Sequence, residues 1–188
     1  ELPSGNSIRA KIEEMQKAGE RAASLIRQLM AFSRKQPLEP KILPLNSVVG
    51  NVESMLRRLI GEDIQLVIRP DPFNGHVKAD PGQLEQVLMN LVGNARDAMP
   101  NGGLLAIETS QTELARTPMH HLHPLPLGQY VKLTVTDTGC GMNADVLAHL
   151  FEPFFTTKEE HKGTGLGLST VFGIVTTCGG GIDVWSQV

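Results

Sequence analysis

The apolar and polar positions near the start of the chain predict one long amphipathic helix over residues 7–35. Apolar or small residues recur there at alternating steps of four and three, which is a heptad pattern, and charged residues fill most of the other positions. The recurring positions are Ile8, Ile12, Met15, Gly19, Ala22, Ile26, Leu29 and Ser33. Such a stripe needs a partner helix, which we expect from a part of the protein outside this sequence or from a second subunit.

After this helix the pattern predicts a linker and then a second domain of mixed strands and helices. Pro37, Pro40 and Pro44 interrupt helical propagation, so we place the domain boundary near Gln36. The predicted organisation is 1–36 as the helix, 37–45 as linker and first strand, and 46–188 as the second domain. Beyond Gln36 the expected strands are 40–45, 63–70, 103–111, 130–137 and 181–186, and the expected helices are 47–60, 81–98, 143–150 and 166–177.

Local capping signals define the ends of two of these helices. Asn46 is expected to cap the first helix, and Gly61 is expected to end it. Asp80 is followed by Pro81 and, three residues after the cap, by Gln83, which together form a strong start signal for the next helix. Strands mixed with helices, without regular βαβ repeats, predict an α+β sandwich in which helices cover one face of a mixed sheet.

Composition and charge narrow the possible function classes. The chain has 188 residues, of which 40% are hydrophobic and 20% charged, as expected of a soluble globular protein. The net charge of −3 and the aromatic content of 4% argue against nucleic-acid binding and against adhesion to an anionic membrane. No run approaches the roughly 18 apolar residues of a membrane span, so we expect no direct membrane insertion by this stretch. Cys140 and Cys178 lie far apart without a CxxC pattern, which favours a reducing cytoplasm.

The stretch KGTGLGLSTVFGIV, residues 162–175, has glycines at alternate positions before an apolar run at helical spacing. Gly163, Gly165 and Gly167 indicate that backbone amides come close to a ligand, most often a phosphate. The spacing matches neither a Rossmann turn nor a P-loop. On this stretch alone, a phosphate site and simple capping of the following helix are equally favoured.

A second segment, NLVGNARDAM, covers residues 90–99. Asn90 and Asn94 are four residues apart, so on a helix both amides project from the same face. Amide oxygens are neutral, hard ligands that suit a magnesium ion already carrying phosphate oxygens. Taken alone, however, this pair is better explained as a hydrogen-bonded contact between helices.

Two further segments supply candidate chemistry. In DTGCGM, residues 137–142, Asp137 ends an apolar strand and can accept a hydrogen bond from an adenine amino group, while the glycines let the ring approach the backbone. The alternative is an ordinary Asx turn. In FEPFFTTK, residues 151–158, three phenylalanines form a hinge and Lys158 is a cation that can reach a terminal phosphate. The alternative is a loop anchored by its aromatic residues.

In this order and spacing, the four segments resemble the ATP-binding domain of bacterial sensor histidine kinases, which belongs to the GHKL group. Residues 90–99 resemble the N box, 137–142 the first glycine box, 151–158 the F box and 163–168 the second glycine box. The resemblance covers roughly residues 40–186, and residues 1–36 resemble the second helix of the family's dimerisation and phosphoacceptor hairpin. The wording of the last two boxes is similar to a subgroup that often occurs as hybrid kinases with a receiver domain.

The resemblance implies a Bergerat-type α/β sandwich that binds Mg·ATP between its sheet and a lid, residues 142–162, which we expect to be mobile without nucleotide. Asn94 would be the magnesium ligand, with Asn90 supporting the metal or the phosphates. Lys158 would contact the terminal phosphate, and Asp137 would bind adenine. The cofactor-binding residues so implied are Asn90, Asn94, Asp97, Asp137, Gly139, Gly141, Met142, Thr157, Lys158, Gly163, Thr164, Gly165, Leu166, Gly167 and Leu168; Lys158 and Asn90 are the catalytic candidates. For Asp97, a structural pairing with Arg96 or a nearby turn is equally favoured.

The chain departs from the family in its histidines. Members phosphorylate a histidine on the first hairpin helix, whereas no histidine here precedes His76. The cluster His120, His121 and His123 lacks acidic or cysteine companions and does not favour a metal site. We therefore interpret the sequence as part of a longer kinase, with its last strand truncated, that binds ATP without phosphorylating itself.

The function implied is transfer of the γ-phosphoryl group of Mg·ATP to a histidine and then to an aspartate of a response regulator, in a cytoplasmic homodimer paired through the heptad hairpin. One alternative is an ATPase of the gyrase or chaperone kind. Those enzymes carry a water-activating glutamate at the position of Asn90, whose amide cannot act as a base. The other alternative is a dimeric scaffold whose nucleotide site has decayed.

Overall fold

The computed structural model of the chain describes residues 39–114, 125–158 and 163–188. The chain separates into two units, Glu1–Leu38 and Glu39–Val188, and the description below concerns the second. The predicted heptad helix lies outside the described residues, as do His120, His121 and His123 and the last part of the predicted lid. In the described ranges no helix is long and apolar enough to cross a membrane.

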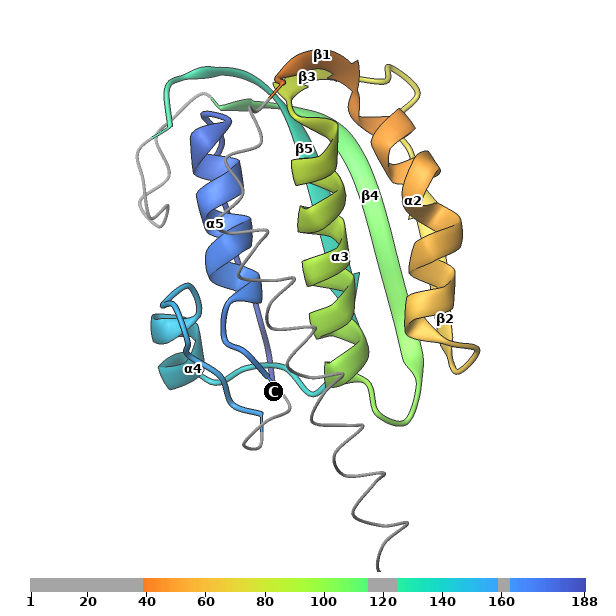
Figure 1. Cartoon of the computed structure of the whole chain (residues 1–188), viewed down its shortest axis with the longest axis vertical. Coiled ribbons are helices and arrows are strands. Elements are labelled where there is room, and N and C mark those ends of the chain that lie inside the picture. The colour runs from red at the N-terminus through yellow and green to blue at the C-terminus, as the bar shows by residue number, and fades with distance from the viewer. Residues whose placement is uncertain (1–38, 115–124, 159–162) are drawn as a thin grey trace, which may run out of the picture. The chain divides into compact units, whose positions relative to one another are not determined.

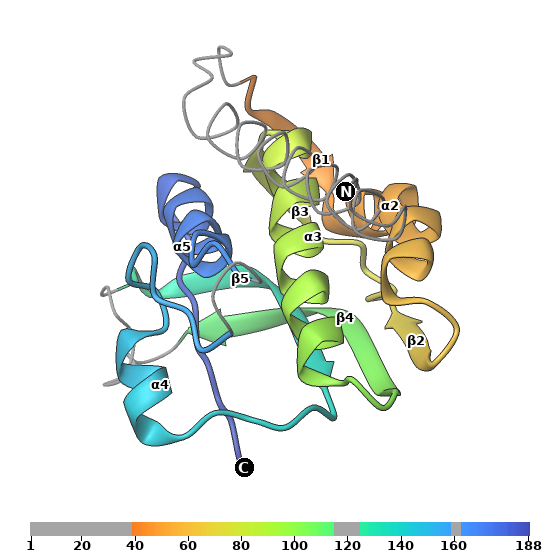
Figure 2. The same cartoon turned by 60° about the horizontal axis from the view of Figure 1, so that its bottom comes forward.

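The described unit consists of helices that cover one face of a mixed sheet (Figures 1 and 2). Within the described residues the strands are ordered β2-β4-β5, where β2 is parallel to β4 and β4 is antiparallel to β5. The strands are β2 (Ile64–Arg69), β4 (Gly103–Leu114) and β5 (Gly128–Asp137), and the covering helices are α2 (Leu45–Ile60), α3 (Pro81–Ala98) and α5 (Gly167–Thr177). The predicted α+β sandwich is confirmed.

A second, two-stranded sheet lies at the start of α3. Its strands β1 (Lys41–Pro44) and β3 (His76–Ala79) pair antiparallel, with Pro44 opposite His76. β1 confirms the strand expected over 40–45, but β3 was not predicted. Four residues next to a loop rich in proline and glycine carry too short a pattern to identify a strand, which is stabilised here by pairing with a distant partner.

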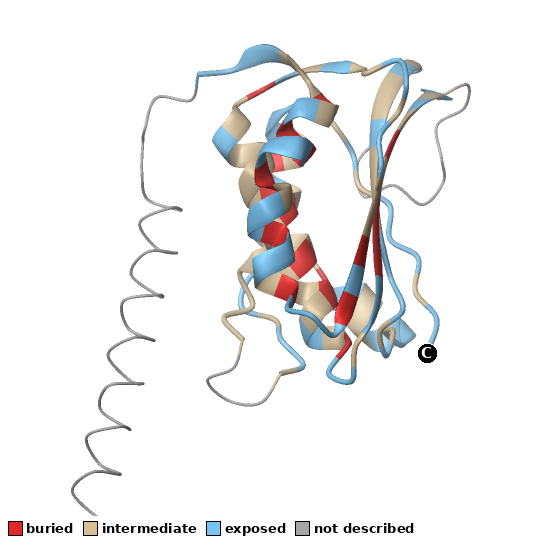
Figure 3. Cartoon of the chain, turned by 90° about the vertical axis from the view of Figure 1, so that its right-hand side faces the viewer, coloured by how far each residue is buried: buried red, intermediate tan, exposed pale blue. Residues whose placement is uncertain are grey.

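The core lies between the helices and the sheet, and Figure 3 shows the buried positions on both of these layers. The side chains of Leu56 on α2, Leu88 on α3 and Leu105 on β4 are each 0% exposed and belong to one cluster. The apolar stripes of α2 and α3 therefore pack into one core shared with the sheet. Because burial of such side chains dominates stability, this packing fixes where the polar face of α3 points.

The capping predictions are confirmed for Asp80 and Gly61 and wrong for Asn46. Asp80 Oδ1 accepts a hydrogen bond from the Gln83 amide at 3.1 Å, and Gly61 ends α2 with a φ of +79°. Asn46 does not cap α2, which begins at Leu45, two residues before the predicted start, with Pro44 at the cap position.

The side chain of Asn46 is instead used in a contact between elements. Its Nδ2 donates to the Asp71 carbonyl at 2.7 Å, and its Oδ1 accepts from the hydroxyl of Thr109 at 2.6 Å. Thr109 is only 8% exposed, so its hydroxyl requires a partner inside the fold. That requirement outweighs the local preference of asparagine for a helix cap.

The strand expected over 181–186 is absent from the structure. The apolar side chain of Ile182 packs against the buried cluster of Val87, Val171 and Ile174, while Trp185 is 84% exposed. Val184 is also exposed, at 42%, so the apolar alternation that predicted the strand corresponds to one packed side chain and not to a buried face. The backbone of this segment forms no ladder with a described strand, so it is not part of the sheet. The short helix α4 (Ala144–His149) confirms the helix expected over 143–150.

Candidate functional site

The second half of α3 carries the two asparagines predicted to bind metal, and the start of α5 lies beside them. A Cβ placed on Gly167, the first residue of α5, would lie 3.8 Å from Asn90 Oδ1 and 3.9 Å from Asn94 Nδ2. The two helices are held together by contacts among Val87, Val171 and Ile174. Both amides therefore lie next to the N-terminus of a helix.

The N-terminus of α5 has the properties of an anion-binding end. Its cap residue is Leu166, which provides no side-chain hydrogen bond to the first turn. The free N–H groups of a first turn and the helix dipole favour negative charge at that position. With Asn90 and Asn94 beside it, this end places backbone N–H groups of a kind that suits a phosphate next to amide oxygens of a kind that suits a metal.

The F box and the second glycine box contact each other directly. The Phe154 amide donates to the Gly165 carbonyl at 2.9 Å, and both residues adopt positive φ values, +69° and +65°. A Cβ on Gly165 would collide with the backbone of Phe154. Glycine is therefore required at residue 165 for the chain approach as well as for the backbone conformation.

Lys158, at the end of the F box, reaches back to α3. Its ammonium donates to Asp97 Oδ2 at 2.6 Å and to Asn94 Oδ1 at 3.3 Å. The side chains of Lys158 and Asp97 are about one-third exposed, at 33% and 30%. The structure thus places a cation on the oxygen predicted to bind magnesium.

Asp97 also pairs with its neighbour Arg96. Its Oδ1 accepts from Arg96 Nε at 2.9 Å and from Nη2 at 2.6 Å. Burial acts to raise the pKa of the Asp97 carboxyl, but the hydrogen bonds from Lys158 and Arg96 outweigh it and hold that pKa below its usual 3.8. The structural pairing of Asp97 with Arg96, one of the two alternatives from the sequence, is therefore present, together with a contact to the F box.

The first glycine box is attached to the end of α3. Asp137, exposed at the end of β5, accepts a hydrogen bond from the Gly139 amide at 2.9 Å through Oδ1, so the Asx turn considered as an alternative does form. A Cβ on Gly139 would lie 2.6 Å from the Cβ of Ala98, and the Cys140 amide donates to the Ala98 carbonyl at 3.1 Å. This contact brings Asp137 to the same end of α3 as Asn94.

The segment that follows the first glycine box contacts the last residues of the chain. Gly141 has a φ of +70°, and a Cβ there would collide with the backbone of Gln187. The Met142 amide donates to the hydroxyl of Ser186 at 2.9 Å. These contacts position the start of the predicted lid.

The remaining candidates of the F box and the second glycine box lie near these contacts. A Cβ on Gly163 would lie 2.6 Å from Thr156 Oγ1, and Thr164 Oγ1 accepts from the Leu166 amide at 3.4 Å. Thr157 is exposed and Leu168 is half-buried in the first turn of α5. The structure therefore brings all four boxes together, and the roles of their residues toward a nucleotide stay predictions.

Three residues outside the predicted set of cofactor-binding residues take part in this arrangement. They are Arg96, which contacts Asp97, Ala98, which receives the first glycine box, and Ser186, which binds the Met142 amide. Of these, the sequence analysis named only Arg96, as a possible structural partner of Asp97. The other two are recognisable only from contacts between distant segments. No group of three or more His, Cys, Asp or Glu side chains in the described ranges could hold a metal.

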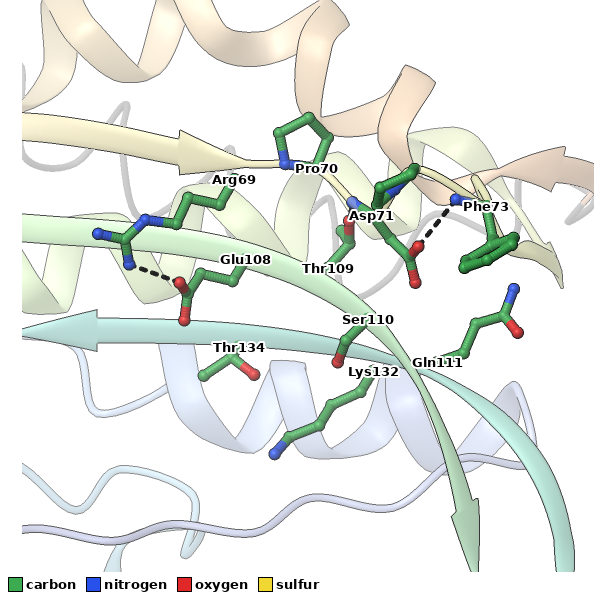
Figure 4. Close-up of a pocket in the computed structure, with 11 residues that line it drawn as sticks. Arg69, Pro70, Asp71, Phe73, Glu108, Thr109, Ser110, Gln111, Lys132 and Thr134 are labelled. Carbon is green, nitrogen blue, oxygen red and sulfur yellow. Dashed lines mark hydrogen bonds and ion pairs between the residues drawn. The ribbon is translucent and has the colours of Figure 1, made fainter.

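A separate open hollow lies elsewhere in the described part of the chain, on the side of Arg69 and Phe73 (Figure 4). Arg69 Nη1 pairs there with Glu108 Oε1 at 2.6 Å. None of the predicted site residues lines this hollow. Lys132 and Thr134 of β5 contribute to it, whereas Asp137 lies at the C-terminal end of that strand.

Comparison with known proteins decides the family. Residues 79–188 match the family described as "Histidine kinase-, DNA gyrase B-, and HSP90-like ATPase". The chain belongs to this family. It is 52% identical over 168 residues to the sensor kinase CckA of Brucella abortus, a match that covers 89% of this chain and 18% of CckA.

Solved histidine kinases share the fold. A structure of ShkA is 25% identical with a TM-score of 0.60, covering 94% of this chain and 35% of ShkA. A structure of ThkA is 23% identical with a TM-score of 0.62, covering 95% of this chain and 47% of ThkA. The chain spans less than half of each of these proteins. It carries the GHKL ATP-binding catalytic domain of a bacterial sensor histidine kinase, as the order of its four boxes predicts.

Proposed function

We propose that residues 39–188 bind Mg·ATP where the end of α3, the start of α5, the F box and the first glycine box meet. The observation that carries this proposal is the ammonium of Lys158 on Asn94 Oδ1, 3.3 Å away and next to the first residue of α5. An amide oxygen that accepts from a cation beside a helix N-terminus supports a magnesium–phosphate site, because such an end favours anions.

Each residue has a separate role in this proposal. Asn94 Oδ1 would coordinate magnesium, with Asn90 supporting the metal or the phosphates. Amides at the start of α5 and the ammonium of Lys158 would bind the phosphate chain, and the carboxylate of Asp137 would accept from the adenine amino group. Magnesium would supply neutralisation of the charge on the phosphate oxygens.

In the full-length protein, we propose that the bound ATP phosphorylates a histidine of the dimerisation hairpin, which then passes the group to a response regulator. ShkA was solved in complex with AMPPNP, and ThkA was solved in complex with the response regulator protein TrrA, which supports a nucleotide and a response regulator as the two partners. Neutral imidazole is a competent nucleophile near pH 7. The hairpin of a second subunit would complete the dimer through the heptad helix.

The test is a titration of the purified chain with a fluorescent ATP analogue, with and without Mg²⁺. We expect saturable binding that Mg²⁺ strengthens, and we expect Asn94→Ala to lose this strengthening, by about tenfold or more in Kd, with an unchanged melting curve. Asn51→Ala, which removes an exposed amide from α2, is the matched control and should bind like the wild type.

Two results would refute the proposal. Absence of saturable binding in the wild type would favour a scaffold with a decayed site. A Mg²⁺ effect that persists in Asn94→Ala would remove Asn94 as the ligand. With γ-labelled ATP, the same chain is expected to take up no stable label, because no histidine precedes His76 in it.

A further inference from the structure

We propose that Asp97 is a positioning residue that holds the ammonium of Lys158 beside Asn94 until nucleotide binds. Before Mg·ATP arrives, the ammonium would thus occupy the position proposed for the metal. This inference rests on the proposed function. In this proposal Asp97 does not contact the nucleotide. It binds Lys158, and Lys158 binds the nucleotide.

The first step is the geometry of the contact. Asn94 and Asp97 are three residues apart on α3 and present oxygens to the same ammonium, at 3.3 and 2.6 Å. Magnesium binds its oxygen ligands at roughly 2.1 Å. An ion bound to Asn94 Oδ1 at that distance would lie close to the ammonium, and like charges at such a separation repel strongly in a partly buried site. The ammonium and the metal would also use the same amide oxygen, so we expect Lys158 to leave this position when the metal enters.

The second step is the fixed position of the carboxylate. Arg96 occupies Oδ1 of Asp97 with two hydrogen bonds, which leaves Oδ2 for Lys158. Arg96 is itself directed by a longer contact, 3.5 Å from Nη1 to the carbonyl of Leu59 near the end of α2. The anion that holds Lys158 is thus already oriented by the helix layer and does not depend on nucleotide.

The third step is the exchange that follows. When nucleotide binds, the ammonium of Lys158 exchanges the carboxylate of Asp97 for the terminal phosphate, and Asn94 exchanges the ammonium for magnesium. A ligand that binds only the released form has its affinity reduced by the fraction of molecules in that form. For an ion pair whose side chains are one-third exposed, we expect the reduction to be about two- to fivefold.

The experiment is a double-mutant cycle on nucleotide affinity. Asp97→Asn should tighten Mg·ATP-analogue binding by about two- to fivefold when Lys158 is present. In a Lys158→Met background, the same substitution should give a smaller gain or none. Glu53→Gln is the matched control, because it removes a carboxylate from an exposed ion pair with Arg57 on α2. That variant should leave the affinity unchanged.

The cycle separates this role from simple repulsion between Asp97 and the phosphates. Repulsion predicts an equal or larger gain when Lys158 is absent, because no ammonium then screens the carboxylate. An equal gain in both backgrounds, or no gain with Lys158 present, would overturn the proposal.

A second readout needs no nucleotide. The rate at which acetic anhydride acylates Lys158 in the free protein can be measured by mass spectrometry, with exposed Lys78 and Lys132 as internal references. Asp97→Asn should raise the relative rate at Lys158 by about the same two- to fivefold factor. An unchanged rate would refute the claim that Asp97 restrains Lys158 in the free protein. A wild type that binds no nucleotide would instead refute the proposed function, so the two failures are distinguishable.

Discussion

Replacing Gly139 by alanine tests whether the first glycine box must lie directly against α3. An alanine Cβ at this position would lie 2.6 Å from the Cβ of Ala98, 2.9 Å from the Ala98 carbonyl oxygen and 2.8 Å from Asp137 Oδ1. Two of these atoms belong to a helix that is packed on the core and cannot retreat. The glycine loop therefore has to move, and Asp137 moves with it.

The cost can be worked from the contacts that hold the loop. The hydrogen bonds of the Cys140 amide to Ala98 O, at 3.1 Å, and of the Gly139 amide to Asp137 Oδ1, at 2.9 Å, would both be disturbed. At about 0.5–1.5 kcal/mol for each bond, the variant should lose about 1–3 kcal/mol of unfolding free energy. For a chain of this size each kcal/mol lowers Tm by about 2–4 °C. Displacement of Asp137 should also raise the Kd for the ATP analogue, on the order of tenfold.

The assay combines thermal melts with nucleotide titration of Gly139→Ala and a matched control. The control is Gly50→Ala, an exposed position in α2 where a Cβ meets nothing within 4 Å. It should gain about 0.5–1 kcal/mol, because alanine is the better helix residue, and its Kd should not change. If Gly139→Ala melted and bound nucleotide like the wild type, the close approach to Ala98 would be irrelevant to the site and the reasoning would fail.

Two further predictions concern stability. Thr109→Val removes the hydroxyl that accepts from the Asp71 amide at 2.7 Å and donates to Asn46 Oδ1 at 2.6 Å, so urea denaturation should show a loss of about 2–4 kcal/mol; Thr109→Ser keeps the hydroxyl and should lose only about 1 kcal/mol, and equal losses would contradict this account. The pKa of Asp97 is held below its usual 3.8, so its pairing stabilises the fold above that pH and is lost as the pH falls through the lower folded value. In thermal melts, the stability difference between the wild type and Asp97→Asn should be constant near neutrality and shrink below about pH 4, whereas a difference that grows in acid would contradict the sign of the shift.

Features determined by neighbouring residues could be predicted from the sequence. Asp80 and Pro81 define the start of α3, and Gly61 defines the end of α2, because capping depends on groups within one helical turn. The mixed sheet with helices on one face followed from apolar periodicity, which reports which side of each element is buried. The four boxes were recognised from residue types and order alone.

Features determined by distant residues could not be predicted in this way. β3 is stabilised by its pairing with β1. The side chain of Asn46 accepts a hydrogen bond from Thr109, which lies 63 residues away. Residues 181–186 have the apolar alternation of a strand, yet they form no ladder with the described strands. In each case a tertiary partner, or the lack of a ladder partner among the described residues, outweighed the local preference.

The same distinction applies to the site. The residue types of Asn94, Asp97 and Lys158 indicated metal and phosphate chemistry, but not that Lys158 and Asp97 form an ion pair across 61 residues. The pairing depends on the path of the F box, which is fixed by the contact between Phe154 and Gly165. The sequence therefore predicted the kinds of chemical group in the site. The structure shows which of these groups share a partner.

Helix α3 explains why these contacts meet at one place. Its core side carries Val92, Ala95 and Met99, which are 0%, 3% and 4% exposed, and this side fixes the rotation and axial position of the helix against the sheet. The intervening positions, Asn94 and Asp97, then necessarily face the start of α5 and the F box. A rotation of α3 large enough to move either oxygen out of reach of Lys158 would expose part of this buried side. The precision of the proposed metal position is therefore set by hydrophobic packing on the opposite face of the same helix, and substitutions in that packing should weaken nucleotide binding without touching the site.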